Sequence, residues 1–288
     1  MFYILDWSWY IFRSYYALPE MKNSNWEDIA AVYWFFRMLL KILQDKPEKF
    51  LIAWDEWWKT KRHEQFEEYK ANRPKMPNEF KNQIKVIKDI INRINIPFIW
   101  YQWYEADDII YTIAKNYKWK STIISSDKDL KQLLSDKVVF LDPVKQQTQT
   151  YKDFEQEMGF PALNIVDYLA LLWDSSDNIP WVKWIWKKTA SDLIKEYWTI
   201  ENIYENIDNI KISVQKKLIE SKDLAFESKA LIQLLEVPDI DANNVWEVSL
   251  DFDLMKKILV EELNFKSMEN LIDNLKNSYN FGTQASLF

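Results

Sequence analysis

The 288-residue chain has no cysteine, a single histidine and only two glycines. Without cysteine it forms neither disulfides nor thiolate metal sites. One histidine, His63, excludes a histidine-rich zinc centre and argues against a serine–histidine–aspartate triad. No segment approaches the roughly 20 apolar residues that span a bilayer, and the N-terminus lacks the layout of a signal peptide. These absences predict a cytoplasmic protein that works with carboxylates and hard cations.

The scarcity of glycine is the most unusual feature. Average usage of about 7% predicts roughly 20 glycines in this length, whereas the chain has 2 glycines and 16 tryptophans. Tight turns need a positive φ or a close approach of the backbone, and a bulky indole opposes both. Several tryptophans nevertheless stand where turns are expected: Trp7 and Trp9 after the first predicted strand, and Trp181, Trp184 and Trp186 after Pro180.

One hypothesis is that most of these tryptophans stand for glycine, through a UGA codon that the source organism reads as glycine. The alternative is a genuinely tryptophan-rich protein. Trp54 and Trp100, each at the end of an apolar strand, fit true tryptophans. If the tryptophans at 181, 184 and 186 are literal, the backbone there cannot approach a bound anion such as a phosphate closely.

The net charge of −7 does not exclude a nucleic-acid partner, because the placement of charge matters more than its sum. Two bound divalent cations would bring the net charge to about −3. A hydrophobic content of 48% and a charged content of 28% fit a soluble globular protein with one large or two modest domains. The basic residues are clustered: Lys59, Lys61, Arg62; Lys70, Arg73, Lys75; Lys183, Lys187, Lys188.

The segment Tyr104-Glu105-Ala106-Asp107-Asp108 places three carboxylates within four residues. It follows an apolar run at 96–99 and precedes a helical pattern at 109–114, so a strand should end and a helix begin here. Capping and the helix dipole account for one or two acids at such a helix start. Three acids in one small volume repel one another, and a bound divalent cation is the usual remedy.

Strands and helices alternate through the first half of the chain. Strands are expected at 2–5, 50–53, 121–125 and 138–141, and helices at 27–43 and 78–95. This order predicts the α/β class, with a mainly parallel central sheet and helices on both faces. Acids follow the strands at Asp6, Asp55, Asp127, Asp129 and Asp142. Because ligand sites of such sheets lie at the carboxyl ends of the strands, we expect these carboxylates at one edge.

From about Tyr151 helical patterns replace strand patterns. An apolar helix at 162–172 leads into Asp174 and Asp177, and then into a hairpin at 179–190. With glycine restored at its tryptophans, the hairpin has the spacing G-x-x-G-x-G before a lysine-bearing helix, a typical anion site. The polar, basic stretch at 56–77 is either a solvated loop or an arm that grips a phosphate backbone.

These motifs, in this order, resemble the 5′-nuclease domain of bacterial DNA polymerase I and its stand-alone and flap-endonuclease relatives. The resemblance covers roughly residues 1–275 and implies a PIN-like 5′-nuclease fold, followed by a helical domain with a helix-hairpin-helix-type motif. The family has glycine at most of the aligned tryptophans. No polymerase or proofreading segment follows, so the chain resembles a stand-alone nuclease or an isolated domain. The matching segments are Asp6, Arg62-His63-Glu64, Tyr69-Lys70-Ala71-Asn72-Arg73-Pro74, Tyr104 to Asp108, Ser126-Asp127-Lys128-Asp129-Leu130, Asp174 to Pro180, and the hairpin through Ala190.

The resemblance implies a structure-specific 5′-3′ exonuclease and 5′-flap endonuclease in primer removal and repair. It would hydrolyse phosphodiesters with two Mg²⁺ ions, which hard oxygen ligands prefer and Mn²⁺ can replace. The implied metal ligands are Asp6, Asp55, Glu105 and Asp107, with Asp108 adjacent, and Asp127, Asp129, Asp174 and Asp177. Lys70 and Arg73 would steady the scissile phosphate, the metal ligand Asp107 is the third implied catalytic residue, and a K⁺ ion would bind at the hairpin. The implied DNA contacts are Arg62, Tyr69 (by stacking on a base), Lys70, Arg73, Lys183, Lys187 and Lys188.

We expect an α/β catalytic domain at 1–155 with the arm at about 56–77, a helical DNA-binding domain at 156–275, and a flexible tail at 276–288. The tail ends in Gln284-Ala285-Ser286-Leu287-Phe288. This ending resembles the peptide by which bacterial replication proteins engage the sliding clamp, and a frayed terminus is the alternative. The expected partner of the monomer is DNA with a 5′ end or flap, or an RNA primer.

Two other functions compete with this one. A ribonuclease on the related acidic-site fold would lack the helical half at 151–275. A non-catalytic DNA-junction binder would lack some carboxylates, yet every matching position here is acidic. Both alternatives therefore fit the sequence less well than a 5′ nuclease.

Overall fold

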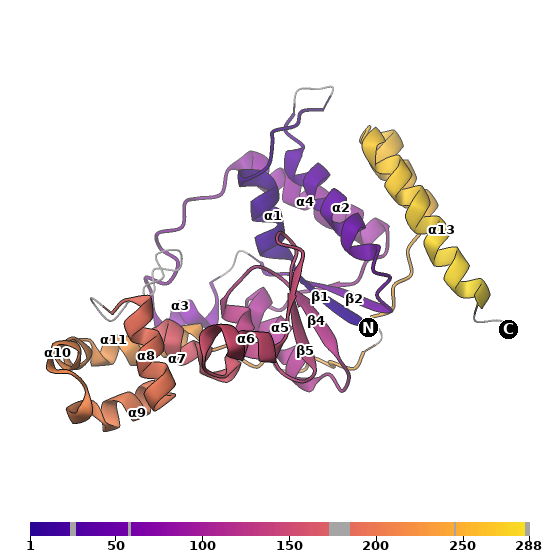
Figure 1. The fold of residues 1–288 in the computed structure, drawn as a ribbon. Coiled ribbons are helices and arrows are strands. Elements are labelled where there is room, and N and C mark those ends of the chain that lie inside the picture. Colours follow the sequence, from indigo (N-terminus) through magenta and orange to yellow (C-terminus); the bar gives the residue numbers. More distant parts are fainter. Residues whose placement is uncertain (24–26, 57–58, 173–184, 245, 286–288) are drawn as a thin grey trace. The chain divides into compact units, whose positions relative to one another are not determined.

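The computed structural model describes residues 1–23, 27–56, 59–172, 185–244 and 246–285, with side chains up to residue 279 (Figure 1). The chain forms two compact units, each assembled from separate stretches of sequence. The first unit comprises Met1–Trp54, Lys75–Ile99 and Asn244–Phe288. The second comprises Asp55–Pro74 and Trp100–Asn243.

Three parallel strands form the centre of the first unit: β1 (Phe2–Asp6), β2 (Lys49–Ala53) and β3 (Phe98–Ile99). Asp6 stands opposite Ala53 in the register of β1 and β2. Every residue of β1 is buried, as is typical of a parallel strand covered on both faces. The predicted parallel pairing is therefore present in this unit.

Several helices of this unit pack on one another. α2 packs against α1, α4 and α13 (Figure 1). In α4, Phe80, Ile84, Ile87 and Ile91 are buried at helical spacing, as the sequence pattern predicts. No helix in the described ranges is long and apolar enough to cross a membrane. The helices of this unit are α1 (Trp7–Tyr16), α2 (Ala30–Leu43), α4 (Asn78–Arg93), α12 (Phe252–Lys256) and α13 (Glu269–Ala285), with a π-helical segment at Lys257–Glu262 and a 3₁₀ turn at Lys266–Met268.

The second unit contains three more strands. β4 (Ser121–Ile124) pairs in parallel with β5 (Val138–Asp142), and β6 (Gln147–Gln149) pairs with β5 in the antiparallel direction. The sequence Gln-Thr-Gln of β6 is polar throughout, so the hydrophobic pattern did not indicate this strand. The mainly parallel α/β class is confirmed, with one antiparallel addition.

Helices make up the rest of the second unit, and α7 packs against α8 and α11 (Figure 1). Its α-helices are α3 (Lys61–Gln65), α5 (Ala106–Asn116), α6 (Tyr151–Met158), α7 (Ile165–Ala170), α8 (Lys187–Tyr197), α9 (Ile200–Glu205), α10 (Ile212–Glu220) and α11 (Lys222–Ile232). Three 3₁₀ turns lie at Asp129–Leu133, Ala162–Asn164 and Ile207–Asn209.

The structure corrects the turn that the sequence suggested at Trp7-Ser8-Trp9. Helix α1 begins at Trp7, because the Asp6 carboxylate accepts a hydrogen bond from the Ser8 N–H and caps the first turn. The Trp7 ring is buried and stacks on Trp54, with ring centroids 3.8 Å apart. This indole therefore fills core space, as a true tryptophan does.

The C-terminal segment also differs from the expected tail. Helix α13 continues to Ala285, so residues 276–285 are helical. Ile272 and Leu275 are buried, and the Tyr279 hydroxyl donates to the Leu43 carbonyl at 3.2 Å. These anchors recur at helical spacing and hold the helix in the first unit. Residues 286–288 of the predicted clamp peptide lie outside the described residues.

The compact units do not divide at residue 155. Residues 156–243 share a unit with β4 and β5, whereas 244–275 share the other with β1 and β2. The chain returns to the first unit where the Phe50 N–H donates to the Trp246 carbonyl at 2.9 Å, beside a bridge between Lys49 and Glu247. Sequence patterns report local structure and do not reveal that a later segment rejoins an earlier unit. The expected division into functional domains stays a prediction.

Two tryptophans adopt a left-handed backbone. Trp103 and Trp198 both have φ of +72°. Trp198 is the C-cap of α8, the position that Gly159 holds after α6 with φ of +77°. The left-handed region costs an L-residue about 1–2 kcal/mol, whereas glycine enters it freely. Both indoles are about half exposed, at 45% and 50%, so each ring still gains from partial burial.

We predict that Trp103→Gly and Trp198→Gly are each more stable than Trp103→Ala and Trp198→Ala, by about 1 kcal/mol. Both substitutions remove the indole, and only glycine enters the left-handed region freely. Denaturant unfolding monitored by circular dichroism measures the difference. Trp119→Gly and Trp119→Ala are the matched control pair, because Trp119 is not among the positive-φ residues and glycine should have no advantage there. Glycine variants no more stable than the alanine variants at positions 103 and 198 would contradict the prediction.

Candidate metal and nucleic-acid site

Glu105 marks the start of helix α5 and of the predicted acidic centre. Its extended backbone, with φ of −89° and ψ of 162°, makes it the N-cap, and Asp108 completes a capping box by accepting from the Glu105 N–H at 3.1 Å. Glu105 and Asp108 are buried, whereas Asp107 between them is half-buried. Helix geometry therefore turns two of the acids inward and leaves Asp107 accessible.

Three donors surround the buried Glu105 carboxylate. Lys70 Nζ lies 2.6 Å from Oε1, while the Tyr69 hydroxyl and Arg62 Nη1 approach Oε2 at 3.1 Å and 3.3 Å. Burial by itself would raise the pKa of Glu105. The charges of Lys70 and Arg62 and the hydrogen bonds from Lys70 and Tyr69 outweigh burial and lower this pKa from 4.5 to about 2. Glu105 is therefore anionic at neutral pH.

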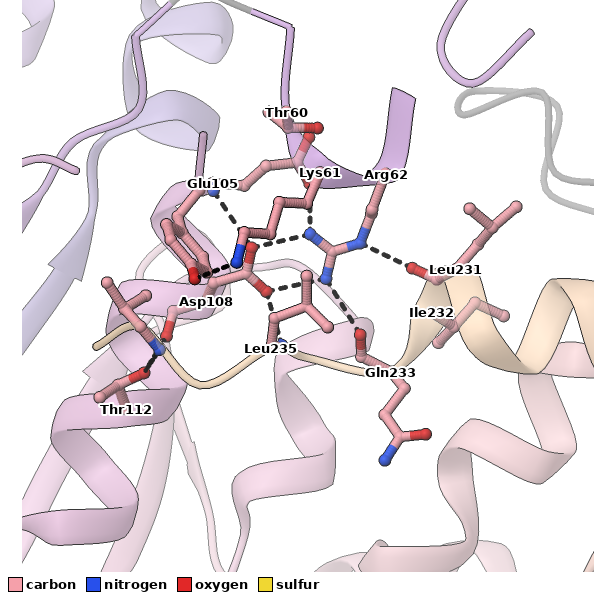
Figure 2. Close-up of polar contacts among 12 residues, drawn as sticks. Thr60, Lys61, Arg62, Glu105, Asp108, Thr112, Leu231, Ile232, Gln233 and Leu235 are labelled. Atoms are coloured by element: carbon pink, nitrogen blue, oxygen red, sulfur yellow. Dashed lines mark hydrogen bonds and ion pairs between the residues drawn. The ribbon is translucent and has the colours of Figure 1, made fainter. Parts of the chain in front are cut away.

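Arg62 and Asp108 form a second buried ion pair, shown in Figure 2. Arg62 Nη1 and Nη2 each donate at 2.8 Å to one oxygen of Asp108, in the bidentate arrangement that a guanidinium favours. Asp108 Oδ1 also accepts from the Leu235 N–H at 2.8 Å. With the Glu105 N–H, the carboxylate accepts four hydrogen bonds.

This pair corrects two of the predicted roles. Arg62 is 2% exposed and is held by Asp108, so it does not present its guanidinium to DNA. Asp108 is 0% exposed, and four donors already use its carboxylate, so it is a structural acid and not a metal ligand. The acidic segment gave no sign of this, because the partners lie at residues 62 and 235.

The basic arm contributes buried as well as exposed groups. Tyr69 was expected to stack on a base, but it is 4% exposed and donates to Glu105. Lys70 adopts φ of +58° and is half-buried at the same carboxylate. Arg73 and Lys59 are exposed. The arm thus delivers a tyrosine and a lysine to Glu105 while keeping other cations at the surface.

The first unit places one predicted metal ligand at the end of a strand. Asp6 ends β1, is 1% exposed, and accepts from the Ser8 N–H at 3.1 Å and the Ser8 hydroxyl at 2.9 Å. Asp55 follows β2 by two residues, belongs to the second unit and is half-buried. The sequence therefore placed both acids correctly after their strands.

The parallel pair β4–β5 gathers further acids at its carboxyl end. The Asp127 carboxylate accepts from the Asp129 N–H at 2.8 Å, and both residues are half-buried. The Ser126 hydroxyl donates to Asp142 at 3.0 Å, which joins the ends of the two strands. Burial alone would raise the pKa of Asp142, but hydrogen bonds from Lys145, Val144 and Ser126 lower it.

The individual metal ligands stay a prediction. The half-buried Asp107, Asp127 and Asp129 and the anionic Glu105 supply the oxygen donors that hard cations prefer. Among the described residues, no group of three or more acids comes close enough to hold an ion. Asp174, Asp177 and Lys183 lie outside the described residues. Lys187 and Lys188 begin α8 and are exposed, as expected for phosphate contacts.

The sequence missed one contact at this site. Lys61 Nζ lies 2.5 Å from the Tyr104 hydroxyl and 4.5 Å from the centre of its ring. This cation–π contact joins α3 to the residue that precedes Glu105. A lysine and a tyrosine 43 positions apart give no pattern from which to predict it.

The fold is shared with nucleases. The chain resembles the T5 5′-exonuclease with zinc bound, at a TM-score of 0.65 and 22% identity over 80% of this chain and 88% of that one. It also resembles the catalytic core of Rad2 in complex with a DNA substrate, at a TM-score of 0.65 and 15% identity over 95% and 91%. At these identities the likeness establishes the fold alone.

Sequence comparison identifies the family. The family model for the 5′-3′ exonuclease N-terminal resolvase-like domain matches residues 1–159, and that for the 5′-3′ exonuclease C-terminal SAM fold matches 160–248. The 5′-3′ exonuclease of Aquifex aeolicus is 32% identical over 99% of both chains. The chain spans 32% of the DNA polymerase I of Caldicellulosiruptor bescii, with 36% identity. The chain belongs to the 5′-3′ exonuclease family.

We predict that acid destabilises the metal-free protein partly through Glu105. Its pKa is lower in the folded state, so its contribution is present above about pH 4.5 and is lost as the pH falls toward 2. Lys70→Met removes the nearest positive charge and should move this loss to higher pH. Urea unfolding with a chelator, repeated between neutral and acid pH, measures the shift.

Lys115→Met is the control for this prediction. Lys115 also pairs with a glutamate, Glu236, at 2.9 Å, but both side chains are about half exposed. Solvent screens such a pair, so the acid-side stability should barely change. Identical curves for the two variants would contradict the assigned environment of Glu105.

Proposed function

We propose that this protein hydrolyses DNA phosphodiesters at 5′ ends and 5′ flaps, with two divalent ions of the Mg²⁺ type. The observation that carries the proposal is the buried, anionic Glu105 beside the accessible Asp107, where the arm and helix α5 meet. A carboxylate held ionised by its surroundings is ready to bind a hard cation at neutral pH. Membership of the 5′-3′ exonuclease family supports the same reaction.

The proposed ligands are the acids that match the family's motifs, apart from Asp108: Asp6, Asp55, Glu105, Asp107, Asp127, Asp129, Asp174 and Asp177. Two divalent ions would supply an activated water and stabilise the leaving oxygen. Asp108 is left out because its carboxylate already accepts four hydrogen bonds. Mg²⁺ is favoured over zinc because the described donors are all oxygen atoms.

The arm and helix α8 would bind the substrate through its phosphates. Arg73 is exposed, and Lys187 and Lys188 extend from the start of α8. Contacts of this kind carry no sequence information, which suits an enzyme that recognises a 5′ end by shape. The K⁺ ion at the hairpin and the use of RNA primers stay predictions, since most of the hairpin lies outside the described residues.

Cleavage of a 5′-flap duplex in Mg²⁺ tests the proposal. We expect Asp107→Ala to lower the rate at least about 100-fold, the scale on which losing one electrostatic contact to the transition state acts. Asp136→Ala is the control, because Asp136 is an exposed acid outside the proposed ligand set. Equal activity of the two variants, or absence of cleavage by the unaltered protein, would refute the assignment.

We also propose that the ending Gln284–Phe288 binds a bacterial sliding clamp, with Leu287 and Phe288 entering an apolar pocket. Deletion of the last five residues should abolish clamp binding in surface plasmon resonance and leave flap cleavage unchanged, because residues 284–288 include none of the proposed metal ligands or DNA contacts. Retained clamp affinity after the deletion would remove this idea.

A further inference from the structure

Arg62 uses its whole donor set inside the second unit. Nε donates to the Leu231 carbonyl at 2.8 Å, and Nη2 donates to the Gln233 carbonyl at 3.1 Å as well as to Asp108. Nη1 donates to Asp108 and Glu105. A guanidinium carries five N–H groups, and these five contacts use all of them. Lysine has neither the number nor the planar geometry to replace it.

Arg62 and its acceptors come from three distant stretches of the chain (Figure 2). Arg62 itself lies in α3 at the base of the arm, Glu105 and Asp108 begin α5, and Leu231 and Gln233 lie at the end of α11. The segment after α11 is also tied to α5, because the Leu235 N–H donates to Asp108 and the Val237 N–H donates to Thr112 Oγ1 at 2.8 Å.

We propose that the Arg62–Asp108 pair is a positioning device that sets the first turn of α5, and with it Glu105 and Asp107, for metal binding. The pair holds Glu105 from two sides, through its N–H and its carboxylate. It also locks the turn to the end of α11, so that the acids cannot shift without breaking buried hydrogen bonds. This inference rests on the proposed metal-dependent function.

The test is the affinity for Mn²⁺ without DNA, measured by isothermal titration calorimetry, together with kcat and KM on the 5′-flap duplex. Arg62→Lys should weaken Mn²⁺ binding about 10–100-fold, the usual effect of removing a residue that orients metal ligands. kcat should fall in parallel, and KM for DNA should change little because Arg62 is buried. Asp108→Asn, which keeps the shape and removes the charge, should act in the same way.

Arg93→Lys is the matched control, because Arg93 pairs with Asp89 and Glu262 in the first unit and is 40% exposed at its side chain. It should alter neither Mn²⁺ affinity nor kcat. A rise in KM with unchanged Mn²⁺ affinity for Arg62→Lys would show a DNA contact instead and overturn the proposal. Lower thermal stability with unchanged Mn²⁺ affinity and kcat would show a merely structural pair and also overturn it.

Amide hydrogen exchange in the unaltered protein tests the same coupling without any variant. Mn²⁺ should slow exchange of the Leu235 N–H, because that group is bonded to Asp108. Unchanged exchange in a protein that binds Mn²⁺ would refute the coupling. If the unaltered protein neither binds Mn²⁺ nor cleaves a flap, the proposed function itself fails, which is a distinguishable result.

A separate observation carries a second inference. We propose that positions 103 and 198 are glycine in the protein as the source organism makes it. Both have φ of +72°, and Trp198 takes the same helix-ending role as Gly159. The chain has 16 tryptophans and 2 glycines, so a codon read as glycine accounts for both the composition and the backbone. The buried, stacked Trp7 shows that the backbone argument does not extend to every tryptophan.

Mass spectrometry of the protein purified from its natural source tests the proposal at position 198. The tryptic peptide that follows Lys195 and ends at Lys211 contains Trp198 as its single tryptophan. A peptide mass lighter by the difference between tryptophan and glycine supports the proposal. The mass of the tryptophan-containing peptide would overturn it, whatever the folding behaviour of engineered variants.

Discussion

The second unit depends on the satisfaction of buried charge at the start of helix α5. A carboxylate or guanidinium taken out of water costs several kcal/mol unless partners replace the lost hydration. Arg62 and Asp108 are both almost fully buried, and each finds a partner for every donor or lone pair. That requirement draws together the arm, the acidic turn and the end of α11. The need to pair these buried charges, more than apolar packing, therefore sets the geometry of the acidic centre.

Sequence patterns predicted the parts of the fold that repeat along the chain. The buried strand β1 and the apolar face of α4 have clear periods, and carboxylates follow parallel strands where the fold places ligands. The pairing of Arg62 was not predictable in this way. Two of its acceptors are backbone carbonyls about 170 positions away. Every residue type has a backbone carbonyl, so the sequence does not indicate which one accepts a hydrogen bond. The turn predicted at Trp7 was wrong because a residue that follows a strand can begin a helix as well as a turn.

The acidic segment shows why adjacent residues of one type take different roles. Successive positions on a helix point about 100° apart, so Asp107 and Asp108 cannot face the same way. Asp108 turns inward to Arg62, and Asp107 remains half-buried. Sequence alone identified an acidic cluster at a helix start. The division into a structural acid and an accessible acid required the position of Arg62.

Lys70 ties the arm to the acidic centre through an ion pair. Its ammonium lies 2.6 Å from Glu105 Oε1, which is the charge neutralisation that a bound cation would otherwise provide. Two unit charges of like sign about 4 Å apart repel by about 4 kcal/mol at an effective dielectric constant of 20. Lys70 and a cation bound at the same oxygen would therefore repel each other. Lys70 also sits at φ of +58°, in the left-handed region that costs an L-residue about 1–2 kcal/mol. The arm thus holds Lys70 beside Glu105 despite this backbone cost, and the ion pair keeps Glu105 anionic in the metal-free protein.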